Sequence, residues 1–399
     1  MAFYYKLGTI PHKRHVQFRQ PDGSLYSEQL VGTLGFSGVS SLLYHKNPPT
    51  KVLRIDKPIP YGPKKADAHL QPSHLRPFNG DSTGNDYLQA RKPMLMNNDC
   101  VISICLPKQR EMDYFYKNAL ADEVIFIHQG SGELISQMGK IEVREGDYVV
   151  IPRTIIHKWR WNEGPVRLLI TESFSPIETV RRYRNHFGQL LEHSPYCERD
   201  MRPPTELVME DKTEGEVRIQ IKKEGFLHQY VYDYSPLDVV GWDGYFYPYA
   251  ISIHDFEPIT GRIHQPPPVH QMFESQSFVI CSFVPRLYDY HPLSIPAPYN
   301  HSNVDSDEVL YYVDGQFMSR KGIDVASFTI HPSGLPHGPH PGTVEASIGK
   351  KETHELAVMI DTFKPLYLTE DAMELLDNNY PFSWYEGRPD TPRPADMMD

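Results

Sequence analysis

Short runs of hydrophobic residues alternate with turn-forming residues along most of the chain. Between residues 91 and 174 the runs are VISICL, EVIFI, YVVIP and VRLLI. Between 205 and 365 they resume as VRIQIK, HQYVYDY, SFVICSFV, EVLYYV, VASFTI and LAVMID. Runs of this length, rich in β-branched and aromatic residues and bounded by turns, are typical of β-strands. The pattern predicts a mainly β protein with two strand-rich regions, preceded by an N-terminal extension of strands and loops at 1–90.

The segment 175–204, between the two strand-rich regions, carries helical signals instead. Ser175 can cap a helix, Pro176 suits the first helical position and Glu178 completes a capping box. An apolar stripe at helical spacing begins at Ile177. We therefore expect a helix that bridges two β domains.

Two histidines and a glutamate stand out in the second strand-rich region. His301 and Glu308 lie in HSNVDSDEVLYYVDG, and His337 ends HPSGLPH. Any one of the 19 histidines is weak evidence alone, but two imidazoles and a carboxylate suit a non-haem Fe(II) with open positions for substrate and oxygen. Glu308 opens a strand that ends at an Asp-Gly turn, and His337 follows a Pro-x-Gly turn that closes another strand. We predict that these three residues meet and bind the metal.

The same pattern occurs earlier in the chain. The stretch DEVIFIHQGSG aligns with DEVLYYVDGQF and pairs Glu123 with Glu308. Likewise, IPRTIIH aligns with HPSGLPH and pairs His157 with His337. Tyr116 stands where the first histidine of the triad is expected, so the earlier copy lacks one ligand. We predict a structural role for the earlier copy and metal binding by the later one only.

An internal repeat at this distance favours two duplicated barrels over one large sheet. With 399 residues, the chain has room for two such domains with full cores. We expect the degenerate first barrel at 91–174, the metal-binding barrel at 205–365 and a tail at 366–399. In the tail, TEDAMELLDN begins with Thr369 as a cap and predicts a short helix.

The composition indicates which binding partners and which cellular compartment to expect. The formal net charge of −11 argues against nucleic acid or an anionic membrane as the main partner. The N-terminus has no apolar signal-peptide core and no segment offers 18 apolar residues, so neither secretion nor membrane spanning is expected. Cys100, Cys105, Cys197 and Cys281 are scattered without a C-x-x-C pair, as is usual for thiols in a reducing compartment. We expect a cytoplasmic protein.

A second group of histidines accompanies the predicted ligands. His264 and His270 flank three prolines in GRIHQPPPVHQMF, whose fixed φ makes a stiff extended segment. In one interpretation this is a rigid loop whose imidazoles face water. In the other it lines the metal pocket, where a histidine can accept a phenolic proton. His331, six residues before the last ligand, is a candidate for orienting a ligand or substrate, and Asn303 shares the strand face of the first ligand.

These motifs resemble known families. The pattern H-x-N-x4-E-x6-G followed by P-x-G-x2-H resembles the paired motifs of the cupin superfamily, with Asn303 in place of a second histidine. The order IHQPPP, PYNHSN and HPSGLPHGPHPG, with LYSEQLVGT near the N-terminus, resembles the homogentisate 1,2-dioxygenase family. The resemblance implies two cupin barrels of the double-stranded β-helix, or jelly-roll, type. It also implies an Fe(II)-dependent extradiol-type dioxygenase that converts homogentisate and O2 to maleylacetoacetate in tyrosine and phenylalanine catabolism, assembled as trimers or hexamers.

The resemblance also implies roles for single residues. The three predicted ligands would hold the iron, His264 would act as the active-site acid/base, and Tyr299 would line the pocket. His331 would contact a ligand or the substrate. Asp307 lies at the family's shorter spacing from the first histidine, but Glu308 agrees with the internal repeat and is preferred.

One position departs from the family pattern. The family has a tyrosine, associated with the substrate carboxylate, where this chain has Phe317. Losing the hydroxyl removes a hydrogen bond worth ~1–3 kcal/mol to a charged partner. An alternative is therefore a dioxygenase for another para-dihydroxy aromatic, such as a gentisate-like hydroquinone. Two further alternatives are a cupin isomerase or lyase that uses Mn, Ni or Zn as a Lewis acid, and a non-catalytic bicupin that binds sugars or other small molecules.

Overall fold

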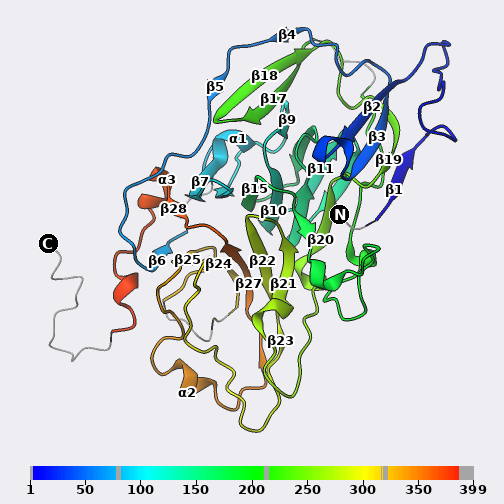
Figure 1. The fold of residues 1–399 in the computed structure, drawn as a ribbon. Coiled ribbons are helices and arrows are strands. Elements are labelled where there is room, and N and C mark those ends of the chain that lie inside the picture. The colour runs from blue at the N-terminus through cyan, green and yellow to red at the C-terminus, as the bar shows by residue number, and fades with distance from the viewer. Residues whose placement is uncertain (1–2, 78–81, 211–214, 316, 318–321, 386–399) are drawn as a thin grey trace.

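The computed structural model describes residues 3–77, 82–210, 215–315, 317 and 322–385, and Figure 1 shows the fold. Strands dominate these residues, and the α-helices among them are three short ones: α1 (Tyr87–Ala90), α2 (Thr343–Ser347) and α3 (Glu370–Met373). Turns of 3-10 helix are η1 (Leu34–Phe36), η2 (Arg181–Tyr183), η3 (Glu198–Asp200), η4 (Ile253–Asp255), η5 (Pro267–His270) and η6 (Tyr380–Phe382). The prediction of a mainly β cupin fold is confirmed. No helix in the described ranges is long and apolar enough to span a bilayer.

Two large sheets form the first barrel, in the orders β20-β13-β10-β15-β8-β7-β28 and β12-β11-β14-β9-β17-β18-β4, with β5 beside β18. Burial alternates along β12 and β14, because successive side chains of a strand point to opposite faces. Ile170 of one sheet and Trp159 of the other belong to the same buried cluster. The bounds are β4 (Arg54–Ile55), β5 (Ile59–Pro60), β7 (Arg91–Met96), β8 (Cys100–Cys105), β9 (Phe115–Asn118), β10 (Asp122–Gln129), β11 (Gly132–Ser136), β12 (Gly139–Val143), β13 (Asp147–Ile151), β14 (His157–Trp161), β15 (Arg167–Ser173), β17 (Val217–Lys223), β18 (Phe226–Tyr232), β20 (Tyr249–Ser252) and β28 (Tyr367–Leu368).

The second barrel, drawn below the first in Figure 1, is built on a seven-stranded sheet in the order β16-β21-β22-β27-β24-β25-β6. A two-stranded sheet joins β23 and β26, and an N-terminal sheet has the order β1-β19-β3-β2. The bounds are β1 (Tyr5–Gly8), β2 (Ser27–Gly32), β3 (Ser40–His45), β6 (Ser73–Leu75), β16 (Glu178–Thr179), β19 (Val239–Gly244), β21 (Gln271–Glu274), β22 (Phe278–Phe283), β23 (Arg286–Leu287), β24 (Asp307–Asp314), β25 (Phe328–His331), β26 (Glu352–Thr353) and β27 (Leu356–Thr362).

Strand pairing repeats between the two barrels. In the first barrel, Tyr116 of β9 pairs with His157 of β14. In the second, His301 pairs with His337 through two backbone hydrogen bonds of 2.9 Å. The two pairs occupy matching positions, so the sequence repeat is also a repeat of the fold.

The predicted helix at 175–204 is wrong. That segment consists of β16, η2, η3 and connecting loops. Ser175 accepts a hydrogen bond from the backbone N–H of Gln276 at 3.0 Å, and the N–H of Ile177 donates to Asp122 at 3.1 Å. These bonds to distant segments replace the bonds of a helix, so tertiary contacts override the local capping signals.

Strand pairing also differs from the expected start of the second barrel at residue 205. β17 pairs with β9 and β20 pairs with β13, so the strands of 217–232 and 249–252 complete the first barrel. β21 is the strand that pairs with β22 in the second barrel. The predicted short helix in the tail is confirmed as α3, whose cap Thr369 accepts a hydrogen bond from the N–H of Ala372.

Buried polar contacts join the two barrels. The hydroxyl of Tyr311, in β24, lies 2.8 Å from Nδ1 of His128, in β10, at hydrogen-bond distance. The hydroxyl of Tyr148, in β13, lies 2.9 Å from that of Ser282, in β22. Hydrogen bonds between buried groups fix the orientation of packed surfaces, because an unpaired partner would be costly.

Candidate metal centre

Three side chains from the second barrel converge as the sequence predicts. Nε2 of His301 lies 3.6 Å from Oε2 of Glu308, and Nε2 of His337 lies 3.5 Å from the same oxygen. One ligand atom from each residue lies within 4.8 Å of the others. Glu308 sits at the start of β24, and the two histidines are held opposite one another by their paired backbones. Two imidazoles and a carboxylate at these distances can hold one metal ion.

The histidine tautomers suit a metal. Nδ1 of His301 lies 3.2 Å from the carbonyl oxygen of Tyr299, and Nδ1 of His337 lies 3.3 Å from that of Leu335. A carbonyl only accepts, so both Nδ1 atoms carry hydrogen and both lone pairs lie on Nε2. Nε2 of His337 is buried and has no hydrogen-bond partner among the residues that the structure describes. A metal ion would satisfy this atom, so the residues present fit a metal.

The two oxygens of Glu308 have different roles. Oε1 lies 2.9 Å from Nδ1 of His331, while Oε2 faces the two candidate ligands. Burial favours the neutral carboxyl, but the neighbouring imidazoles, with His331 hydrogen-bonded to Oε1, outweigh it and hold the pKa of Glu308 well below its usual range. Glu308 is therefore ionised and ready to bind a cation. His331 is 1% exposed, which suits the orienting role expected from its position.

Two other carboxyl groups, those of Asp307 and Asp361, lie close to Glu308. Asp307 accepts hydrogen bonds from the backbone N–H of Ser333 at 2.8 Å and of Leu366 at 2.7 Å, so it holds loops together. This supports Glu308 as the ligand. Asp361 pairs with Glu308 across β24 and β27, and burial together with that neighbouring charge raises the pKa of Asp361 to about 8. Asp361 was not predicted from the sequence, although the repeat aligns it with the glutamate of TES at 171–173.

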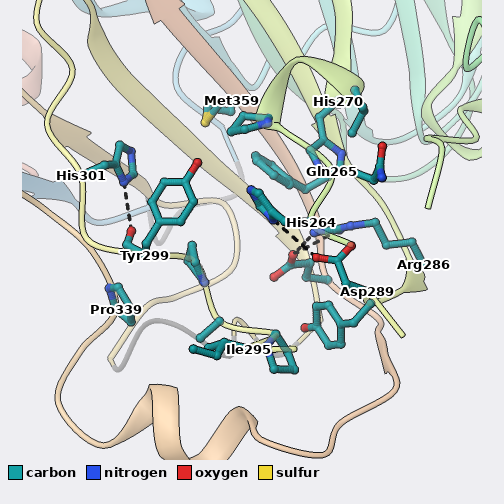
Figure 2. Close-up of a pocket in the computed structure, with 18 of the residues that line it drawn as sticks. His264, Gln265, His270, Arg286, Asp289, Ile295, Tyr299, His301, Pro339 and Met359 are labelled. Carbon is teal, nitrogen blue, oxygen red and sulfur yellow. Dashed lines mark hydrogen bonds and ion pairs between the residues drawn. The ribbon is translucent and has the colours of Figure 1, made fainter. Parts of the chain in front are cut away.

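A cavity of about 1210 Å³ opens beside the candidate ligands (Figure 2). The predicted residues His264, His270, Tyr299, Asn303 and Phe317 all line it. Its wall is otherwise mostly apolar, with a few charged side chains that the sequence analysis did not single out, Arg286, Asp289 and Glu355 among them. The structure therefore brings the proline-flanked histidines to the candidate metal centre.

His264 and Tyr299 lie next to one another in this cavity (Figure 2). The Tyr299 ring makes edge contacts with His264, at 5.5 Å between centroids, and with His301, at 6.1 Å. Nδ1 of His264 lies 3.5 Å from Oδ2 of Asp289. The carboxylate favours hydrogen on Nδ1 and leaves the lone pair of Nε2 for a proton from a ligand in the cavity. The His264 side chain is 60% exposed, so a ligand can reach it.

His270 and Phe317 offer the cavity no charge. Burial, then the charge of Arg286, lowers the pKa of His270 to about 3, so its imidazole stays neutral and accepts protons poorly. Its ring packs against Phe283 at 4.8 Å. The Phe317 ring packs edge-on against Tyr312 at 4.3 Å. Asn303 holds the ligand loop, because its backbone carbonyl accepts from the N–H of Gly334 at 2.7 Å.

The matching position of the first barrel holds an arginine. Arg91 donates to Glu123 at 2.8 Å and to Glu172 at 2.7 Å, and all three side chains are almost fully buried. The hydroxyl of Tyr116 donates to Glu123 at 3.1 Å. Burial raises the pKa of Glu172, but Arg91 and Lys222 have the larger, opposite effect and lower this pKa to about 2. The guanidinium supplies the positive charge that a metal would bring, which supports a structural role for this barrel.

Comparisons with known proteins agree with these features. The family model described as homogentisate 1,2-dioxygenase N-terminal matches residues 8–253 and ends directly after β20. A protein of Saccharolobus solfataricus named "Putative dioxygenase" is 40% identical and covers 96% of this chain and 100% of its own length. Homogentisate 1,2-dioxygenase of Rhizobium meliloti is 28% identical over 90% of this chain and 86% of its own.

Among solved structures, a cupin 2 conserved barrel domain protein from Leptotrichia buccalis covers 78% of this chain and 98% of its own, with 11% identity and a TM-score of 0.30. The match of the family model spans more than half of the sequence. The chain therefore belongs to the homogentisate 1,2-dioxygenase family and is an enzyme of the dioxygenase kind.

Proposed function

We propose that this protein is an Fe(II)-dependent ring-cleaving dioxygenase whose substrate is homogentisate, converted with O2 to maleylacetoacetate in tyrosine and phenylalanine breakdown. The observation that carries the proposal is the convergence of His301, Glu308 and His337 beside a cavity large enough for an aromatic ring. Two histidines and one carboxylate leave coordination positions for substrate and oxygen. The family relationship supports ring cleavage as the reaction class.

Each residue of the site has a different proposed role in the reaction. Bound Fe(II) would supply the redox chemistry that joins dioxygen to an electron-rich ring. Nε2 of His264 accepts the phenolic proton of the substrate, while Asp289 holds the opposite nitrogen of the ring. The edge of Tyr299 stands between His264 and His301 and limits where a flat substrate can lie. His331 keeps Glu308 oriented throughout.

Phe317 and Arg286 bear on which side chain the substrate carries. Phe317 offers no hydroxyl to a carboxylate, and the cation Arg286 is already paired with Glu355 at 3.3 Å. A para-dihydroxy aromatic without the acetate arm, such as a gentisate-like hydroquinone whose carboxylate is on the ring itself, is therefore the second candidate substrate. A non-catalytic binding protein fits less well, because a proton acceptor and a metal triad lie beside one cavity. Oxygen uptake distinguishes a dioxygenase from a cupin isomerase or lyase.

Oxygen uptake tests the proposal. Full-length protein, loaded anaerobically with Fe(II), is mixed with homogentisate, gentisate and other para-dihydroxy aromatics in an oxygen electrode. We expect uptake with at least one of them, and with homogentisate a product that has the spectrum of maleylacetoacetate. Iron-loaded protein that consumes no oxygen with any of these compounds would refute the proposal.

We also propose a cytoplasmic location and a homo-oligomeric assembly. The four cysteines are free thiols, which agrees with a reducing compartment such as the cytoplasm. The family resemblance supports a homotrimer or hexamer, and sedimentation of the purified protein measures this directly.

A further inference from the structure

The last described segment of the chain packs behind the candidate metal centre. Tyr380, in η6, is 3% exposed, and its hydroxyl lies 3.0 Å from Nε2 of His331. The other ring nitrogen of His331 lies 2.9 Å from Oε1 of Glu308. A continuous hydrogen-bonded chain therefore joins the C-terminal segment to the central carboxylate of the triad.

The direction of each hydrogen bond follows from the groups involved. The ionised carboxylate of Glu308 only accepts, so Nδ1–H of His331 donates to it. A neutral His331 then has its lone pair on Nε2, and the hydroxyl of Tyr380 donates to that atom. Oε1 is thereby fixed, and Oε2 is turned toward the two histidine ligands.

The same segment holds the loop that carries the other buried ligand. The Trp384 ring stacks on His340, with centroids 4.3 Å apart and planes 11° from parallel. Its indole N–H donates to the carbonyl of Gly338 at 3.1 Å. Nε2 of His340 lies 2.8 Å from the hydroxyl of Ser383. Because Gly338 directly follows His337, these contacts restrict where that ligand can move.

We propose that residues 380–384 form a brace for the metal centre, and that Tyr380 is a positioning residue that sets metal affinity through His331. The inference rests on the proposed function in one respect, since it takes Glu308 to be a ligand. Partners that hold a ligand in place typically contribute about 10- to 100-fold to metal affinity. Tyr380 is linked to Glu308 through His331, so we expect loss of its hydroxyl to weaken metal binding.

Two matched variants isolate this effect. Tyr380→Phe removes one hydroxyl and keeps the ring, which packs against His74 at 5.4 Å and Trp384 at 5.3 Å. Tyr311→Phe removes a buried hydroxyl that also bonds a histidine, at 2.8 Å from His128, in the contact between the barrels. The two changes are chemically alike, but only the first hydroxyl is linked to a proposed ligand.

Affinity for Co(II) is the readout, because it needs no turnover. Metal-free full-length protein is titrated anaerobically with Co(II), followed by the visible absorption of the ion and by tryptophan fluorescence, since Trp384 lies against the ligand loop. We expect Tyr380→Phe to bind Co(II) about 10- to 100-fold more weakly and to shift its absorption bands at saturation. Tyr311→Phe should bind and absorb as the wild type does.

The outcomes separate the brace from the proposed function. If the wild type binds no Co(II), the proposed metal centre fails, and the brace with it. If the wild type binds Co(II) and the two variants match it in affinity and spectrum, only the brace is overturned. Should Tyr380→Phe not fold, Trp384→Phe tests the same segment by removing the bond to Gly338, and unchanged affinity in that variant also overturns the proposal.

Discussion

Arg91 neutralises two buried carboxylates in the first barrel, and its loss should destabilise the protein. It makes hydrogen bonds of 2.8 and 2.7 Å to Glu123 and Glu172, with all three side chains at most 2% exposed. Breaking a buried ion pair from one side typically costs about 3–5 kcal/mol, because the remaining charge is left uncompensated. The pKa of Glu172 gives a separate figure: its fall from 4.5 to about 2 is equivalent to ~3 kcal/mol, and Arg91 is the main cause that lowers it. We therefore expect Arg91→Met to destabilise the protein by about 3–5 kcal/mol at pH 7.

Urea unfolding of the purified variants measures this change, followed by circular dichroism. Arg160→Met, in the same barrel, is the matched control. Arg160 also contacts two carboxylates, Glu111 at 3.0 Å and Glu133 at 3.3 Å, but its side chain is 47% exposed. Exposed pairs of this kind contribute about 0–1 kcal/mol. If Arg91→Met costs no more than Arg160→Met, the guanidinium is not compensating buried charge, and our reading of the first barrel is wrong.

Three further predictions concern the metal, the substrate and acid stability. His301→Ala should lose both bound iron and oxygen uptake, whereas His354→Ala, at a side chain 77% exposed, should keep them; a His301→Ala protein that retains iron would show that the triad is wrong. Phe317→Tyr should raise kcat/KM for homogentisate by about 10-fold if the new hydroxyl meets the carboxylate, and no gain would contradict that placement. Burial, then Arg167, lowers the pKa of His128 to about 4. The unfolded chain therefore takes up a proton first as pH falls from 6.5 to 4, and stability drops by at most ~3 kcal/mol. His128→Gln should remove this part of the pH profile, and an unchanged profile would show that the imidazole is not kept neutral by folding.

Local patterns in the sequence were sufficient to predict that His301, Glu308 and His337 converge. Glu308 and His337 each stand at a fixed distance from a turn, and the earlier copy repeats those distances. Because strand side chains alternate with a period of two, such spacing indicates which face of the sheet each side chain lies on and where along the strand it stands. The aligned positions Tyr116 and His157 are paired in the first barrel as His301 and His337 are in the second.

Contacts between segments far apart in the sequence leave no sequence pattern from which they could be predicted. Arg91 and Glu172 are 81 residues apart, and His331 and Tyr380 are 49 apart, so neither pair shows as a period or a motif. The helix predicted at 175–204 failed for a related reason. Ser175 has the right chemistry for a cap, but its hydroxyl is used by Gln276 in another part of the chain.

Under the proposed function, Arg91 also has a consequence for how the protein would respond to iron supply. The first barrel carries its positive charge in its own sequence, so its stability does not depend on the metal content of the cell. The second barrel gains stability from metal only in proportion to occupancy. Iron starvation should therefore leave folded, inactive chains in store, and a later influx of iron would restore activity without new synthesis.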